Sequence, residues 1–171
     1  MSTFEQFFRE QYSSIVALCA WLTGDRAAGE DLAQDAFGAV HRRWDEVAPL
    51  DRPGAYARRV AINLSSNERR RRSRERRAVT RLAPTDGADP TASAQLRAVE
   101  RREPLWAAVA ELPVQQRAAV GLRYLEDLST DEIAAVLGCS PATVRVHLHR
   151  AHRRLAERLG CSTDEDQEDL R

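Results

Sequence analysis

Apolar residues recur every three or four positions along most of this chain, which is the spacing of amphipathic helices. The pattern predicts one helix over residues 3–22 and a second from about 25 to 44. Between them, Thr23-Gly24-Asp25 is a break, and Asp25 is a suitable N-cap for the second helix. Pro53 fits the first turn of a third helix. We therefore predict a first domain of three helices around one apolar core, over residues 1–78.

The second half of the chain has the same kind of pattern after an interruption. Periodicity is lost over residues 79–97, where Pro84, Gly87 and Pro90 indicate a flexible linker. Helical spacing resumes near Ala98, a further helix begins at Pro113, and two more are predicted near 130–137 and 141–159. No segment alternates as a strand would. The pattern predicts an all-α fold of two small helical domains, the second over residues 98–160, followed by an acidic, disordered tail at 161–171.

The segment from Ser129 to Arg150 has the pattern of a helix-turn-helix motif. Ser129 and Glu132 have the spacing of a capping box, and Gly138 suits the left-handed end of a helix. Ser140 and Pro141 suit the cap and first position of the next helix. An exposed helix of this kind fits a major groove and can reach base edges. Its outward positions are Thr143, Arg145, His147, His149, Arg150 and Arg153.

Charge is distributed very unevenly along the chain. There are 26 basic and 26 acidic side chains, so the net charge is zero, and every basic residue is an arginine. Residues 25–51 hold seven acids and three arginines, whereas residues 52–81 hold eleven arginines and two glutamates. The helix after Pro141 is also basic. We attribute the excess of arginine mainly to a G+C-rich genome, but two separate basic surfaces favour nucleic-acid binding.

Several other classes of protein fit the sequence poorly. The longest apolar run, 15–22, is far shorter than the ~20 residues of a membrane span, and no signal peptide is visible. The three cysteines form no CxxC pair, so a reducing cytoplasm is expected. His147, His149 and His152 do not share one helix face, which argues against zinc. No nucleophilic triad or phosphate-binding loop is present, so we expect no enzymatic activity, no metal and no cofactor.

Residues 4–78 and 103–159 together resemble a bacterial RNA polymerase sigma factor of the sigma-70 family, in its small extracytoplasmic-function group. The first stretch contains LTGDRAAGEDLAQDAFGAVHRRWDEV and PGAYARRVAINLSSNERRRR, which are similar to region 2. The second contains LPVQQRAAVGLRYLEDLSTDEIAAVLGCSPATVRVHLHRAHRRL, which is similar to region 4. The resemblance implies a subunit that binds core RNA polymerase and directs initiation at promoters through their −10 and −35 elements. It also suggests an anti-sigma factor as a partner.

The resemblance further implies roles for particular residues. The contact with core polymerase falls on the second predicted helix, at Glu30, Asp31, Gln34, Asp35 and Phe37. The −10 element falls to the third, at Tyr56, Arg59, Asn63, Asn67, Arg69, Arg70, Arg71 and Arg72. The −35 element falls to the outward positions of the helix-turn-helix. The acidic tail is outside the family pattern.

Two alternatives stay open on sequence alone. A stand-alone helix-turn-helix regulator would bind duplex DNA without polymerase, usually as a dimer. A helical interaction protein, such as an inhibitor of another factor, would leave both basic surfaces unexplained.

The length of the linker predicts how far apart the two domains can lie. Its 19 residues extend to ~63–68 Å but average only ~22–26 Å when relaxed. We therefore expect the free chain to be more compact than the promoter-bound one.

Overall fold

The computed structural model describes residues 3–82 and 104–160, with the backbone alone described at 72, 73 and 75–82, and all its regular elements are helices. The first domain contains α1 (Phe4–Thr23), α2 (Arg26–His41), the single turn α3 (Trp44–Val47) and α4 (Pro53–Leu82). The second contains α6 (Pro104–Glu111), α7 (Val114–Tyr124), α8 (Thr130–Leu137) and α9 (Pro141–Leu159). The predicted all-α class is confirmed. Helix α4 continues past residue 78, and the predicted linker from residue 83, the start of the second domain at 98–103 and the acidic tail lie outside the described residues.

The helix ends follow the local signals in the sequence. The Asp25 carboxylate accepts from the Ala28 backbone N–H at 2.8 Å and caps α2. Ser129 and Glu132 form the capping box of α8, which ends at Gly138 with a φ of 67°. Ser140 then caps α9, with Pro141 in its first turn. Since each cap depends only on residues within a few positions, these predictions needed no knowledge of the fold.

Helices α1, α2 and α4 enclose an apolar core in the first domain. Phe7 and Cys19 of α1 are buried against Phe37 of α2 and Ala61 of α4. The pairing of α1 with α2 is close because residue 29 is glycine. A Cβ at Gly29 would lie 2.5 Å from the Ala20 Cα, so a larger residue would force these helices apart.

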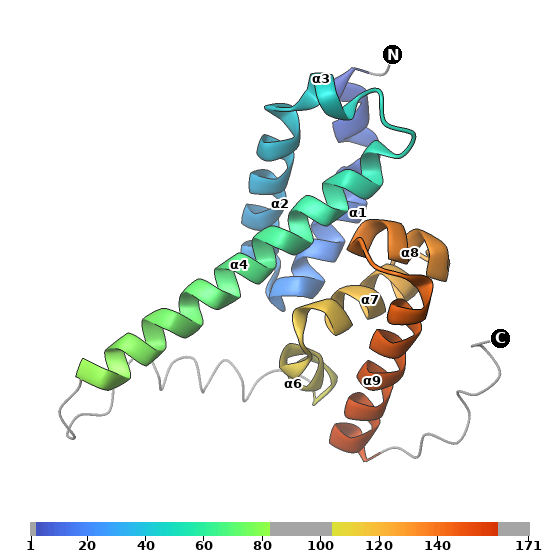
Figure 1. The fold of residues 1–171 in the computed structure, drawn as a ribbon. Coiled ribbons are helices and arrows are strands. Elements are labelled where there is room, and N and C mark those ends of the chain that lie inside the picture. Colours follow the sequence, from blue (N-terminus) through green and yellow to red (C-terminus); the bar gives the residue numbers. More distant parts are fainter. Residues whose placement is uncertain (1–2, 83–103, 161–171) are drawn as a thin grey trace.

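A second buried cluster joins the two domains. Leu18 and Leu22 of α1 and Ile62 of α4 pack with Leu122 and Ile133 of the second domain. In Figure 1, helices α6 to α9 lie together on one side of α1 and α4, with α2 on the other. We refer to this packing of the second domain on α1 and α4 as the closed arrangement. It makes the described part of the molecule more compact than two separate domains joined only by a linker.

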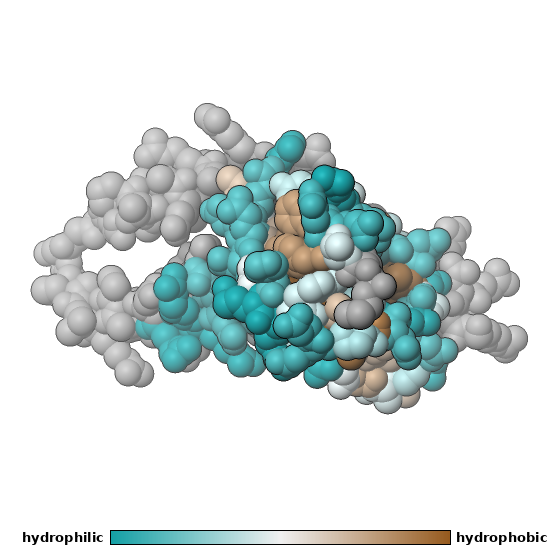
Figure 2. Space-filling model, turned by 90° about the horizontal axis from the view of Figure 1, so that it is seen from above, coloured by the Kyte–Doolittle hydropathy of each residue, from teal (hydrophilic) through white to brown (hydrophobic). Residues whose placement is uncertain are grey.

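Helix α4 is the longest element and extends beyond both domains. Figure 1 shows its first half packed among the other helices and its arginine-rich end projecting away from them. Figure 2, a view from above, shows hydrophilic residues over most of the described surface, with a few apolar residues near its centre. No helix in the described ranges is both long and apolar enough to cross a membrane.

Candidate nucleic-acid interface

Helix α9 turns its apolar side into the second domain and its basic side outward. Val144, Leu148 and Ala151 are buried, as the motif predicts. Arg145, His149, Arg150 and Arg153 are exposed. Thr143 is half-buried, and its hydroxyl lies 2.9 Å from that of Ser140. The N-terminal half of α9 can therefore approach a groove without rearrangement of its core.

Two arginines of α9 contact other helices of the second domain, and Arg153 pairs with Glu157 of its own helix at 3.5 Å. Arg154 donates to the Gln116 side chain at 3.1 Å, and Arg158 forms an ion pair with Glu111 of α6. Both hold α9 to the second domain. By contrast, the structure gives Arg145 and Arg150 no hydrogen-bond or ion-pair partner within the described ranges. These two guanidinium groups are therefore free to bind phosphates or base edges.

His147 is less outward than its place in the predicted set suggests. It is half-buried, and its Nδ1 is buried with no hydrogen-bond partner among the described residues. Burial, and then the positive charge of Arg150, lower the pKa of His147 below its ordinary value of 6.5. The ring is therefore neutral near pH 7 and adds no charge to this face.

Four polar residues form an exposed strip along α4. Arg59, Asn63, Asn67 and Arg70 follow one another at spacings of four, four and three, so they share one face of the helix. The structure thus brings half of the predicted −10 set together. We call these four residues the α4 strip.

The rest of the predicted −10 set lies elsewhere. Tyr56 is half-buried, and its hydroxyl accepts from the Arg43 guanidinium at 3.1 Å. Arg71 forms an ion pair with Glu68 at 3.2 Å. Arg69 points to the second domain. The side chain of Arg72 is outside the described part of the structure.

Two of these arginines contact the second domain. A Cβ placed on Gly138, in the turn before α9, would lie 2.8 Å from a terminal nitrogen of Arg59. Arg69 donates to the carbonyl oxygens of Leu112 at 3.1 Å and Ala110 at 3.3 Å. Partial desolvation lowers the pKa of Arg69 below its ordinary value. In the closed arrangement, Arg59 and Arg69 therefore lie against the second domain, although the sequence analysis predicts that both contact DNA.

Three of the five residues of α2 that are predicted to contact core polymerase are exposed. Asp31, Gln34 and Asp35 are exposed, while the half-buried Glu30 pairs with Arg26 at 3.0 Å. Phe37 is only 4% exposed and packs against the rings of α1, so it belongs to the core and not to this face. Its apolar helical spacing already indicated that position.

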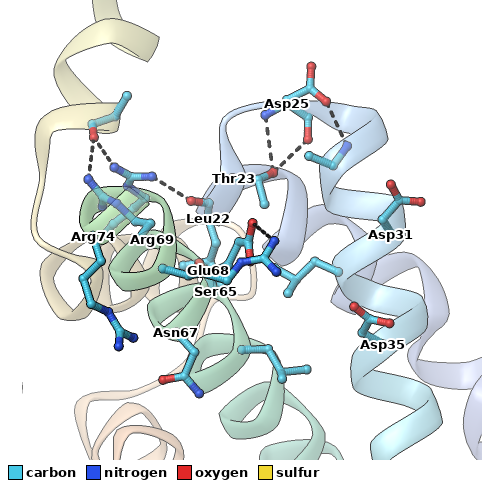
Figure 3. Close-up of a pocket in the computed structure, with 16 residues that line it drawn as sticks. Leu22, Thr23, Asp25, Asp31, Asp35, Ser65, Asn67, Glu68, Arg69 and Arg74 are labelled. Atoms are coloured by element: carbon cyan, nitrogen blue, oxygen red, sulfur yellow. Dashed lines mark hydrogen bonds and ion pairs between the residues drawn. The ribbon is translucent and has the colours of Figure 1, made fainter. Parts of the chain in front are cut away.

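A groove of about 1220 Å³ is lined by the acidic helix α2 on one side and the basic helix α4 on the other. Figure 3 shows Asp31 and Asp35 on the α2 side, with Asn67, Arg69 and Arg74 on the α4 side. Ala110 and Arg117 of the second domain also line it. The groove thus presents opposite charges on its two walls, which fits a partner with both kinds of side chain.

The contacts between the domains include residues that the sequence analysis did not select. Arg58 of α4 pairs with Glu126, in the loop after α7. Trp21 is half-buried at the domain boundary, and its ring lies 5.4 Å from that of Trp106, which is 39% exposed. Arg117 is 3% exposed. The sequence did hold a signal for these contacts. Trp21 and Arg117 place an indole N–H and a guanidinium on apolar helix faces, and buried donors of this kind need acceptors.

Comparisons with known proteins agree with this architecture. The family model for Sigma-70 region 2 matches residues 7–75, and that for Sigma-70, region 4 matches residues 102–155. The chain is similar to the RNA polymerase sigma-E factor of Streptomyces avermitilis, with 35% identity over 156 residues covering 91% of this chain and 84% of that protein. It is also similar to the ECF RNA polymerase sigma factor SigE of Mycolicibacterium smegmatis, with 31% identity over 170 residues, 96% of this chain and 65% of that protein.

A solved structure shares the fold. The sigma factor RpoE from Bartonella quintana, crystallised in complex with the anti-sigma factor NepR, matches with a TM-score of 0.70 at 22% identity. The match covers 92% of this chain and 96% of that one.

Proposed function

Because the chain belongs to the sigma-70 family of RNA polymerase sigma factors, in its extracytoplasmic-function group, we propose that its described surfaces divide the recognition of one promoter between them. A protein of this family acts with core RNA polymerase, directs transcription from particular promoters and is not an enzyme. The question for this chain is which of its side chains carry each task.

The −35 element falls to the outward face of α9. The observation that carries this assignment is the pair Arg145 and Arg150, exposed and without partners in the described ranges, on a helix whose N-terminus is capped and clear of the core. Such guanidinium groups donate two bonds to guanine or to phosphate. His149 and Arg153 extend the same face, and Thr143 lies at its start.

The −10 element falls to the α4 strip, with Arg69, Arg71 and Arg72 on neighbouring phosphates. The two asparagines offer both donors and acceptors to unpaired bases, and the arginines offer charge to the backbone. Tyr56 lies about one turn before the strip, where its hydroxyl accepts a hydrogen bond from Arg43. Extruding a base costs a few kcal/mol, so a cationic rim beside it supplies compensating contacts.

The contact with core polymerase falls to the exposed acids of α2, Asp31 and Asp35, together with Gln34 and Glu30. Their like charges favour a basic partner surface. Phe37 supports this face from the core beneath it. The site of action is the cytoplasm, where core polymerase and promoter DNA are found. An anti-sigma factor is a further partner, as with the RpoE relative.

Reconstituted transcription with core polymerase tests these assignments. Arg145→Ala with Arg150→Ala should abolish promoter choice while core binding is kept, and should reduce the slope of log affinity against log salt by about 2. Asp31→Asn with Asp35→Asn should weaken core binding instead. Arg9→Ala removes an exposed arginine on α1, outside all three surfaces, and is the control. If both double variants behave like the control, the assignments are wrong.

A further inference from the structure

We propose that Val146 is a specificity-determining residue of the −35 contact, and that it selects a thymine by packing against the C5-methyl group of that base in the major groove. The proposal rests on the assignment of the outward face of α9 to duplex DNA, and it adds the identity of one base to that assignment. Val146 has no side-chain donor or acceptor, so it is absent from the polar set predicted for this helix.

Val146 lies at the centre of the outward face of α9. It is two positions from each of the buried residues Val144 and Leu148. At about 100° per residue, a side chain in this place points directly away from both of them. Its exposed fraction is 44%, and among the large apolar side chains that are exposed in the described ranges it is the one on α9. The centre of the proposed DNA face is therefore apolar.

The neighbours of Val146 on this face are small or basic. Ala142 is exposed one turn before it, and His149 and Arg150 are exposed one turn after it. Arg145 is exposed directly before it in the chain. A single exposed valine is ordinary on a protein surface. Val146 differs because guanidinium groups on either side of it, when bound to phosphate or guanine, would carry it to the floor of the groove.

The floor of the major groove offers one apolar group to such a side chain, the C5-methyl group of thymine. Each methyl group that leaves water on contact raises the affinity about fourfold. Cytosine presents an amino group at this edge and guanine presents two acceptors. Against valine, these polar groups would lose water without gaining a hydrogen bond, which is unfavourable. Val146 therefore favours thymine both by what it contacts and by what it excludes.

The side chain and its helix are both rigid before DNA binds. A β-branched valine in a helix adopts one χ1 rotamer about 90% of the time, so little rotamer freedom remains to be lost on contact. Ser140 caps the start of α9, and Arg154 donates to Gln116 of α7 at 3.1 Å. The two γ-methyl groups of Val146 are thus held in a fixed position relative to the second domain.

The test uses holoenzyme reconstituted from core polymerase and the full chain. Duplexes with a random window upstream of a fixed unpaired bubble are selected for binding. The best duplex is then remade with deoxyuridine in place of each thymidine of the window in turn, which removes only the C5-methyl group. We expect the substitution at one position to weaken binding about fourfold, the value of one methyl group. Replacement of the same pair by C·G should weaken binding further.

Three variants assign the effect to a side chain. Val146→Ala removes both γ-methyl groups from an exposed position, and alanine is the better helix former, so the fold is kept. It should bind the thymine and uracil duplexes equally. Val146→Thr keeps one γ-methyl group and should keep part of the preference. Leu125→Ala removes a side chain that is 50% exposed outside α9, and this control should discriminate as the wild type does.

The outcomes separate this proposal from the one on which it rests. If no uracil in the window weakens binding of the wild type, or if Val146→Ala keeps the discrimination, Val146 does not read a methyl group and the proposal is wrong. If the Arg145→Ala, Arg150→Ala variant selects the same window sequence as the wild type, the assignment of α9 to the −35 element fails instead.

Discussion

Trp21 and Arg117 each donate a hydrogen bond across the domain boundary to the backbone of the other domain. The Trp21 indole N–H donates to the carbonyl oxygen of Arg117 at 2.8 Å. In return, the Arg117 guanidinium donates to the carbonyl of Leu22 at 2.6 Å and to those of Ala110 and Leu112. These carbonyls lie at or near the C-terminal ends of α1 and α6, where a positive charge is favourable. Arg117 is thus a structural residue, although the sequence analysis predicts DNA contacts for many of the other arginines.

Arg117→Met should lower the free energy of unfolding by about 3 kcal/mol or more. Methionine fills much of the space, but three buried carbonyls lose a charged donor, and such bonds contribute ~1.5–3 kcal/mol each. Urea denaturation followed by circular dichroism measures the change. The same substitution at the exposed Arg9 should stay within about 0.5 kcal/mol. Equal effects at the two positions would contradict the structural role.

Gly138→Ala should destabilise the chain more than Gly160→Ala. Both glycines have a left-handed φ, 67° and 66°, where alanine costs about 1–2 kcal/mol. Only Gly138 has a neighbour, because Arg59 lies over it, whereas nothing lies within 4 Å of a Cβ at Gly160. Thermal unfolding of the two variants isolates the excess cost at Gly138. A larger effect at Gly160 would show that Arg59 does not pack on this turn.

Acidification should destabilise the chain through His147. Its pKa is lowered in the folded protein, so the unfolded chain binds the proton more readily. The stability that the neutral ring provides is complete above about pH 6.5, the unfolded value, and is lost as pH falls through the lower folded value. His147→Gln should therefore show a smaller fall in melting temperature between pH 7.5 and pH 5.5. An unchanged fall would mean that His147 is solvated as in a peptide.

Cys19 should resist alkylation in the native chain. Burial, and then the negative charge of Glu126, raise the pKa of its thiol to about 12. Since the thiolate is the nucleophile, iodoacetamide at pH 8 should modify Cys19 much more slowly than the half-buried Cys139. Mass spectrometry of the separate peptides follows each site. In urea the two rates should converge, and a fast native reaction at Cys19 would contradict its burial.

The sequence predicted what depends on near neighbours. The caps at Asp25, Ser129 and Ser140 and the left-handed Gly138 were all correct, because each involves residues three or four positions apart. Helical spacing likewise separated the buried from the exposed side of α9. The charges of α2 and α4 were placed on the right helices for the same reason.

The sequence did not predict which arginines are structural. In the sequence, Arg58, Arg117 and Arg154 cannot be told from the exposed arginines near them, and only partners tens of positions away distinguish them. Periodicity describes one helix at a time, so it could not show that Leu22 and Ile133 share a core. For the same reason, the sequence analysis expected a compact free chain but could not predict which faces of the two domains pack together.

The length of α4 has a mechanical consequence. Its 30 residues correspond to ~45 Å of rigid rod, of which only the first half is packed against other helices. A tilt of about 10° at the packed half would move the far end by roughly 4 Å, more than half the rise of one helical turn. A small displacement at Arg58 is thus magnified at the arginine-rich tip, so α4 is a lever that converts small changes in domain packing into larger movements of its far end.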